Sequence, residues 1–244
     1  MHAPAEVATS EHSTSATDAL APWWHSLLVL AGVAGLSIAS AHEHGLPNLH
    51  IPGLNPRLSS YFTVISAEWG LALIIWIALK QRGRTLGSVV SGRWKSPLAF
   101  FRDIGLAIAF FAVVTIPLSL LVNRLAPHTP DQATLMVLPK TVLELAVWLA
   151  MSATAGFCEE FVFRGYFAQQ FSAWTGSRSL GVVAQAICFG VAHMQYSKGV
   201  MVGIAFLGLF LGLLCQWRKS LLPSMLVHGI QDALGGIEGF LSHP

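Results

Sequence analysis

Two adjacent carboxylates and one guanidinium stand in an otherwise apolar stretch of this sequence, as Glu159, Glu160 and Arg164. Residues four apart on a helix share a face, so Glu160 should pair with Arg164, which would lower the cost of burying both charges. Glu159 lies about 140° around the helix from Arg164. We therefore expect Glu160 to be structural and Glu159 to face a cavity, where a partly desolvated carboxylate can act as a general base. The alternative is that both glutamates lie at a hydrated helix end.

Two histidines and an aspartate further along the chain could complete a site with these carboxylates. His193 ends an apolar run, with Phe189 one turn earlier on the same face, and His228 and Asp232 share a helical face four residues apart. Taken singly, each has a plain structural reading, as an interfacial histidine or as a hydrogen-bonded pair between helices. Together with Glu159 they come from three separate predicted helices. Their convergence would give a hydrolytic or a metal site.

The composition predicts the scaffold that must position these groups. Of 244 residues, 54% are hydrophobic and only 11% are charged, against roughly 25% charged in soluble domains. We therefore predict an all-α fold, a polytopic transmembrane helical bundle. The net charge of +2 and the absence of a basic stripe with interleaved aromatic residues argue against nucleic-acid binding. The three cysteines form no CxxC pair, so no disulfide framework is expected.

About seven apolar segments are long enough to cross a bilayer, which takes roughly 20 helical residues. They are 22–41, 61–79, 104–122, a helix that starts near Thr141, 180–194, 199–217, and a last one from after Ser220 to near Phe240. The first could be a signal peptide, but no Lys or Arg precedes it, so we favour a retained helix. Gly208-x-x-x-Gly212 and Gly235-x-x-x-Gly239 are spacings that allow close helix packing.

The chain divides into a predicted disordered tail at 1–20, accessory transmembrane helices and loops at 21–136, and a polar-motif core at 137–244. Ten of the basic residues fall on the side of the 80–95 loop and four on the other. The positive-inside rule then places the N-terminus in the cytoplasm, with the cavity opening to the same side. We expect a multi-pass protein of a bacterial-type inner (plasma) membrane.

Three motifs in this order resemble the CAAX-protease and bacteriocin-processing family of intramembrane proteases, which includes the CAAX prenyl endopeptidases. They are Glu-Glu-x-x-x-Arg at 159–164, Phe-x-x-x-His at 189–193 and His-x-x-x-Asp at 228–232. The resemblance covers about 139–234, so the predicted core becomes a candidate protease core. The segments before it carry no motif of the family.

The resemblance implies hydrolysis of peptide bonds inside the membrane. Glu159 with His193 would activate a water, and His228 with Asp232 would bind and polarise the scissile carbonyl. Glu160, Arg164 and Phe189 would support the site. Asp232 stands where prenyl endopeptidases often have Asn. An ionised Asp would repel an oxyanion, so Asp232 should be protonated, paired with His228, or holding another group.

The resemblance leaves the cofactor open. Glu159, His193 and His228 resemble a zinc set with an open position, but we favour a metal-free mechanism with Glu159 as the base and expect no cofactor. The expected partners are membrane lipid and a peptide or lipidated-protein substrate, such as a prenylated tail or a bacteriocin leader. Oligomeric state is not predicted. An ion-coupled transporter and a catalytically idle immunity or scaffold protein are the competing functions.

One geometric difficulty accompanies the hypothesis. If the predicted fifth helix starts at Leu180, His193 lies about 20 Å into the membrane, while His228 lies only about 12 Å in. The groups can meet only if that helix starts outside the membrane or the helices tilt and stagger.

Overall fold

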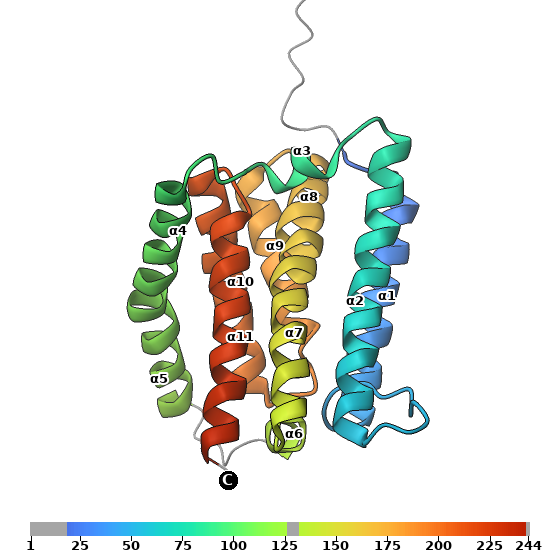
Figure 1. The fold of residues 1–244 in the computed structure, drawn as a ribbon. Coiled ribbons are helices and arrows are strands. Elements are labelled where there is room, and N and C mark those ends of the chain that lie inside the picture. The colour runs from blue at the N-terminus through green and yellow to red at the C-terminus, as the bar shows by residue number, and fades with distance from the viewer. Residues whose placement is uncertain (1–18, 126–131, 243–244) are drawn as a thin grey trace, which may run out of the picture.

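The computed structural model describes residues 19–125 and 132–242, which form a bundle of helices without any strand in those ranges (Figure 1). The first half contains two long neighbouring helices, α1 (Trp23–His42) and α2 (Pro56–Gln81), and the short α3 (Leu86–Val90). A second long rod follows, made of α4 (Pro97–Phe110), the π-helical turn η1 (Phe111–Thr115) and α5 (Ile116–Leu125), and then the short α6 (Gln132–Val137).

The second half carries the polar motifs. One continuous helix consists of α7 (Val142–Glu159), the π-helical segment η2 (Glu160–Phe167) and α8 (Ala168–Thr175). The chain then forms α9 (Arg178–Val191), α10 (Lys198–Arg218) and α11 (Leu222–Ser242). In Figure 1, α7 and α11 stand side by side at the centre, with the α4–α5 rod on one side and the α1–α2 pair on the other.

Local sequence signals set the ends of the core helices. α7 begins with a capping box, in which the Thr141 side chain accepts from the Glu144 N–H and the Glu144 carboxylate accepts in return. This confirms the predicted start near Thr141. Gly176, with φ of 68°, ends α8 in the left-handed conformation that favours glycine. Ser177 then caps α9, so these two helices form a tight hairpin.

The bundle is a polytopic membrane protein. Five helical stretches have the length and apolarity needed to cross a bilayer: Trp23–His42, Pro56–Gln81, Pro97–Leu125, Val142–Thr175 and Lys198–Arg218. Large apolar side chains such as Leu98, Val113 and Val142 are exposed. A soluble protein would not tolerate so much exposed apolar surface, whereas lipid tails accommodate it. The predicted all-α polytopic fold is confirmed.

The two other predicted spans form helices that differ from a simple membrane span. α9 has 14 residues and is therefore about 21 Å long, shorter than the roughly 30 Å hydrocarbon core. It ends at Val191 rather than near Met194, and His193 lies in the turn that follows. α11 has 21 residues, but His228, Gln231 and Asp232 make its middle polar. Both helices pack within the bundle and line the candidate site described below.

The end of the predicted tail is ordered. Residues 1–18 lie outside the described residues, but Leu20 is buried, with an exposed fraction of 1%. The backbone N–H groups of Leu20 and Ala21 donate to Oε1 of Gln170 in α8, at 2.8 and 3.2 Å. The start of α1 is therefore tied to the helix that carries the first motif. The division into accessory helices and core stays a prediction.

Glycines allow the closest helix crossings. A Cβ on Gly156 of α7 would lie 2.8 Å from the Cα of Gly229 in α11, so these two backbones touch where the helices cross. This contact brings the end of α7 to the middle of α11, where His228 lies.

The two predicted glycine pairs have different outcomes. Gly208 packs against Phe189, and Gly212 packs against Gln185 and Val182, so α10 packs closely on α9 as predicted. Of the 235–239 pair, Gly239 packs against Leu138, whereas Gly235 faces open space. Gly236 is the residue of this helix that packs against Trp148.

Candidate active site

The site is built where the first long core helix changes from α to π geometry. Glu159 is the last residue of α7 and Glu160 the first of η2, and the eight residues of η2 are all buried. A π segment widens the helix and rotates the side chains that follow, and such segments occur often at functional sites. Nothing in the sequence predicted this change. It sets the directions in which the two adjacent carboxylates point.

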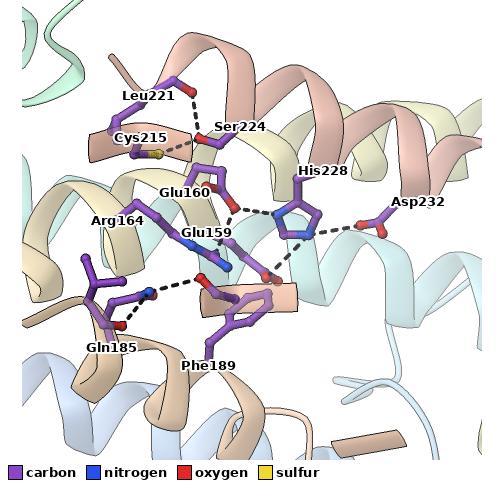
Figure 2. Close-up of polar contacts among 12 residues, drawn as sticks. Glu159, Glu160, Arg164, Gln185, Phe189, Cys215, Leu221, Ser224, His228 and Asp232 are labelled. Carbon is purple, nitrogen blue, oxygen red and sulfur yellow. Dashed lines mark hydrogen bonds and ion pairs between the residues drawn. The ribbon is translucent and has the colours of Figure 1, made fainter. Parts of the chain in front are cut away.

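Glu160 is the centre of a buried ion pair (Figure 2). Its Oε1 lies 2.8 Å from a terminal guanidinium nitrogen of Arg164, and both side chains have no exposed surface. The pair expected from the four-residue spacing is therefore present. The same Oε1 lies 2.9 Å from Nδ1 of His228 in α11, which sequence reasoning missed. Glu160 therefore accepts a hydrogen bond from His228 as well, and it fixes the orientation of that ring.

Phe189 packs against the Arg164 guanidinium and against the rings of His193 and His228. The Arg164 guanidinium lies over the Phe189 ring at 4.1 Å from its centroid, a cation–π contact. The His193 and His228 rings meet the same ring edge-on, at centroid distances of 4.8 and 5.8 Å. Phe189 thus contacts Arg164 of the ion pair and both imidazoles, and it restricts how the two rings can turn. This matches the supporting position that the second motif implied.

The second ring nitrogen of His228, Nε2, points toward two carboxylates. Its Nε2 lies 3.7 Å from Oε2 of Glu159 and 3.5 Å from Oδ2 of Asp232 (Figure 2). These distances exceed those of ordinary hydrogen bonds. The side chains of Glu159 and Asp232 are 21% and 34% exposed, whereas Glu160 is fully buried. The two adjacent glutamates thus occupy different environments, as their helical directions predicted.

His193 presents one ring nitrogen to the cavity. Its Nδ1 lies 2.8 Å from the backbone carbonyl oxygen of Phe189. A carbonyl only accepts, so Nδ1 carries the proton and donates, and in the neutral ring Nε2 keeps its lone pair. The expected difference in depth does not keep the groups apart, because His193 and His228 line the same cavity. The chain turns back directly after Val191 and places His193 beside the cavity.

One cavity of about 390 Å³ joins these groups. Glu159, His193, His228 and Asp232 all line it, so the structure brings together the four residues that the sequence singled out as catalytic candidates. The remaining wall is mostly apolar and comes from α1, α2, α7 and α10, with side chains such as Leu36, Val64 and Leu207. A buried polar cluster at one side of an apolar cavity is typical of a ligand or substrate site.

Sequence reasoning missed Glu68. It lies in α2, is 8% exposed, and lines the same cavity close to Glu159. No motif or spacing pointed to it, because it stands alone in an apolar helix of 26 residues. The general rule that an ionisable residue in a membrane helix is a functional candidate would have found it.

The polar side chains do not form a three-ligand metal set. In the part of the chain that the structure describes, no group of three or more His, Cys, Asp or Glu side chains is arranged to hold a metal ion. His228 donates from Nδ1 to Glu160, and its Nε2 lies 3.7 Å from Glu159. No step of the proposed mechanism uses a metal.

Comparison with known proteins supports the resemblance to intramembrane proteases. Residues 141–234 match the family model described as Type II CAAX prenyl endopeptidase Rce1-like. The search of curated proteins and the search of solved structures gave no match. The matched segment contains all three motifs and starts within a few residues of the resemblance found in the sequence. The match supports a CAAX-type intramembrane protease in general terms. The core of this chain, residues 141–234, is thus similar to the Type II CAAX prenyl endopeptidases, and the resemblance predicted from its three motifs is confirmed.

Proposed function

We propose that the protein is an intramembrane endopeptidase that hydrolyses peptide bonds of membrane-associated peptides or proteins with a water activated by Glu159 and His193. The observation that carries the proposal is the convergence of Glu159, His193, His228 and Asp232 on one cavity inside a membrane bundle. Acid, base and oxyanion-binding groups must converge in this way for hydrolysis.

The chemistry follows from the hydrogen-bonding roles of the side chains. The Glu159 carboxylate accepts a proton from the water while the water oxygen attacks the scissile carbonyl carbon. Nε2 of His193 is an acceptor and helps to orient that water. The carbonyl oxygen becomes an oxyanion, and Nε2–H of His228 donates to it. Glu159 then returns its proton to the leaving amine as the C–N bond breaks, which restores the starting state.

Glu160 and Arg164 support the oxyanion donor. With Nδ1 of His228 held by Glu160 at 2.9 Å, the ring must carry its second proton on Nε2 to donate. A ring that touches the buried Glu160 and faces two further carboxylates is well placed to carry both protons. The ion pair with Arg164 keeps Glu160 ionised without exposing it to water.

The cavity suits a substrate held at the membrane. Its largely apolar wall accommodates apolar side chains or an attached hydrocarbon chain. None of the lining residues is Lys or Arg. The similarity to Type II CAAX prenyl endopeptidases suggests a prenylated Cys-a-a-X tail as one substrate. Unlipidated membrane peptides are the second substrate class to test.

The test is cleavage of membrane-tethered peptides by the purified protein in lipid vesicles, with products identified by mass spectrometry. One set of peptides carries a prenylated C-terminal tail and a matched set carries a transmembrane anchor. We expect cleavage of at least one set, and we expect His193→Ala and His228→Ala to reduce it about 100-fold or more. The control is His42→Ala, an exposed histidine at the end of α1.

Two outcomes count against the proposal. Unchanged cleavage by both histidine variants would place the chemistry elsewhere. Absence of cleavage from every peptide, with binding retained, would favour a transporter or a scaffold protein over a protease.

A further inference from the structure

Glu68 enters the candidate active site from outside the matched segment. It belongs to α2, whereas the family model covers only residues 141–234. The ring of its neighbour Trp69 stacks on Phe157 of α7, with centroids 5.5 Å apart. This contact fixes the position of α2 along α7 two residues before Glu159. The accessory helices therefore deliver a carboxyl group to the cavity at a defined height.

The Glu68 carboxyl lies within hydrogen-bonding reach of the Glu159 carboxyl. Oε2 of Glu68 and Oε2 of Glu159 are both buried, and neither has a hydrogen-bond donor among the described residues. Two ionised carboxylates this close would repel each other, and the cation beside them, the His228 imidazolium, already faces Glu160 and Asp232 as well. No Lys or Arg lines the cavity, and every Lys and Arg of the sequence lies in the described part of the chain. A single proton held between the two carboxyls converts the repulsion into a hydrogen bond.

We propose that Glu68 is a positioning residue for Glu159: as a carboxylic acid it donates a hydrogen bond to the Glu159 carboxylate and holds that carboxylate toward His228 and the cavity. This inference rests on the proposed function, because positioning matters only if Glu159 acts on a water. Glu159 lies at the junction of α7 and η2, and its Oε2 has no hydrogen-bond partner among the described residues. Without Glu68 its carboxylate would be free to rotate within the cavity.

The test distinguishes three possible roles of the Glu68 side chain, which are donating a hydrogen bond, carrying a charge and filling space. Glu68→Gln keeps the shape and an N–H donor, so kcat should stay close to that of the wild type. Glu68→Leu fills the space without a donor, so kcat should fall about tenfold or more, as when an orienting partner is lost. KM should change little in both, since Glu68 does not bind the substrate. Glu238→Gln and Glu238→Leu, at an exposed position in α11, are the matched controls.

Two kinetic results overturn the proposal. If Glu68→Gln loses as much activity as Glu68→Leu, an ionised or proton-transferring carboxyl is required and a donor is not enough. If Glu68→Leu keeps the wild-type kcat, Glu159 needs no such partner. A thermal unfolding midpoint measured for each variant shows whether a loss of kcat reflects loss of fold.

Infrared spectroscopy tests the pair without any substrate. The wild type should show the carbonyl stretch of a protonated carboxyl that is absent in Glu68→Gln and shifted in Glu159→Gln. Absence of that band in the wild type overturns the proposal even if peptides are cleaved. If the band is present but no peptide is cleaved, the proposed function has failed and the catalytic role of Glu68 with it, while the carboxyl pair itself stands.

Discussion

At the scale of single residues, the adjacent glutamates Glu159 and Glu160 have different environments. Glu160 is fully buried against Arg164 and His228, while Glu159 faces the cavity. The four-residue spacing was enough to predict the ion pair, because that contact is local to one helix. The bond from His228 to Glu160 could not be predicted, because it depends on where α11 crosses α7. Glu68 was missed because the helix pairing that brings it to Glu159 has no signature in the sequence.

Asp232 gives a prediction at this scale. Its Oδ2 lies 3.5 Å from Nε2 of His228, where an ionised carboxylate would compete with the oxyanion for the imidazole proton. Asp232→Asn replaces this acceptor by an amide that can donate to the oxyanion. We therefore expect Asp232→Asn to retain or exceed the wild-type kcat, and Asp232→Ala, which offers no donor, to be less active than Asp232→Asn. Steady-state kinetics on the same peptide checks this.

The contrary result for Asp232 is equally informative. An Asp232→Asn variant as inactive as Asp232→Ala would show that the negative charge is needed to hold His228 in its doubly protonated form. The role of Asp232 would then be to stabilise the imidazolium, and the oxyanion would have His228 as its single donor from α11.

At the scale of elements, the site depends on three local features of the helices. The π segment after Glu159 sets the direction of the carboxylates, the short α9 releases His193 into a turn, and the Gly156–Gly229 crossing brings α11 close. The apolar segments of the sequence predicted the helices themselves well. They could not predict a π segment or the early end of α9, because both depend on packing against neighbouring helices.

A second prediction concerns the crossing of α7 and α11 at Gly156 and Gly229. A Cβ on Gly156 would lie 2.8 Å from the Gly229 backbone and from the Met225 carbonyl oxygen, and backbone atoms cannot move aside as a side chain can. Gly156→Ala should therefore separate α7 from α11 and lower the stability by about 1–3 kcal/mol. It should also reduce cleavage, because His228 moves away from Glu159. Unfolding in mixed micelles and peptide cleavage measure the two effects.

A glycine in α11 supplies the matched control. Gly235 has open space around its Cβ position, so Gly235→Ala removes a flexible residue from a helix without a clash. It should leave cleavage unchanged and raise the stability by up to about 1 kcal/mol. If Gly156→Ala behaves in the same way as Gly235→Ala, the close crossing is not what assembles the site.

At the scale of the whole molecule, the bundle holds a small polar reaction site within a lipid-facing shell. Composition alone was sufficient to predict the polytopic all-α fold, because lipid exposure demands apolar helices throughout. The count of spans was less predictable, since α9 is too short to cross a bilayer and α11 carries polar side chains in its middle. The orientation of the N-terminus and the type of membrane stay predictions from the distribution of basic residues.

The central claim concerns the whole assembly, that a carboxylate and imidazoles gathered from separate helices hydrolyse a peptide bond without a metal. The most direct measurement is the rate of peptide cleavage by wild type and Glu159→Gln after treatment with phenanthroline, with Glu238→Gln as control and metal content recorded. The account predicts full activity for the treated wild type and the control, and a loss of about 100-fold or more for Glu159→Gln. Undiminished cleavage by Glu159→Gln, or cleavage abolished by the chelator and restored by zinc, would contradict it.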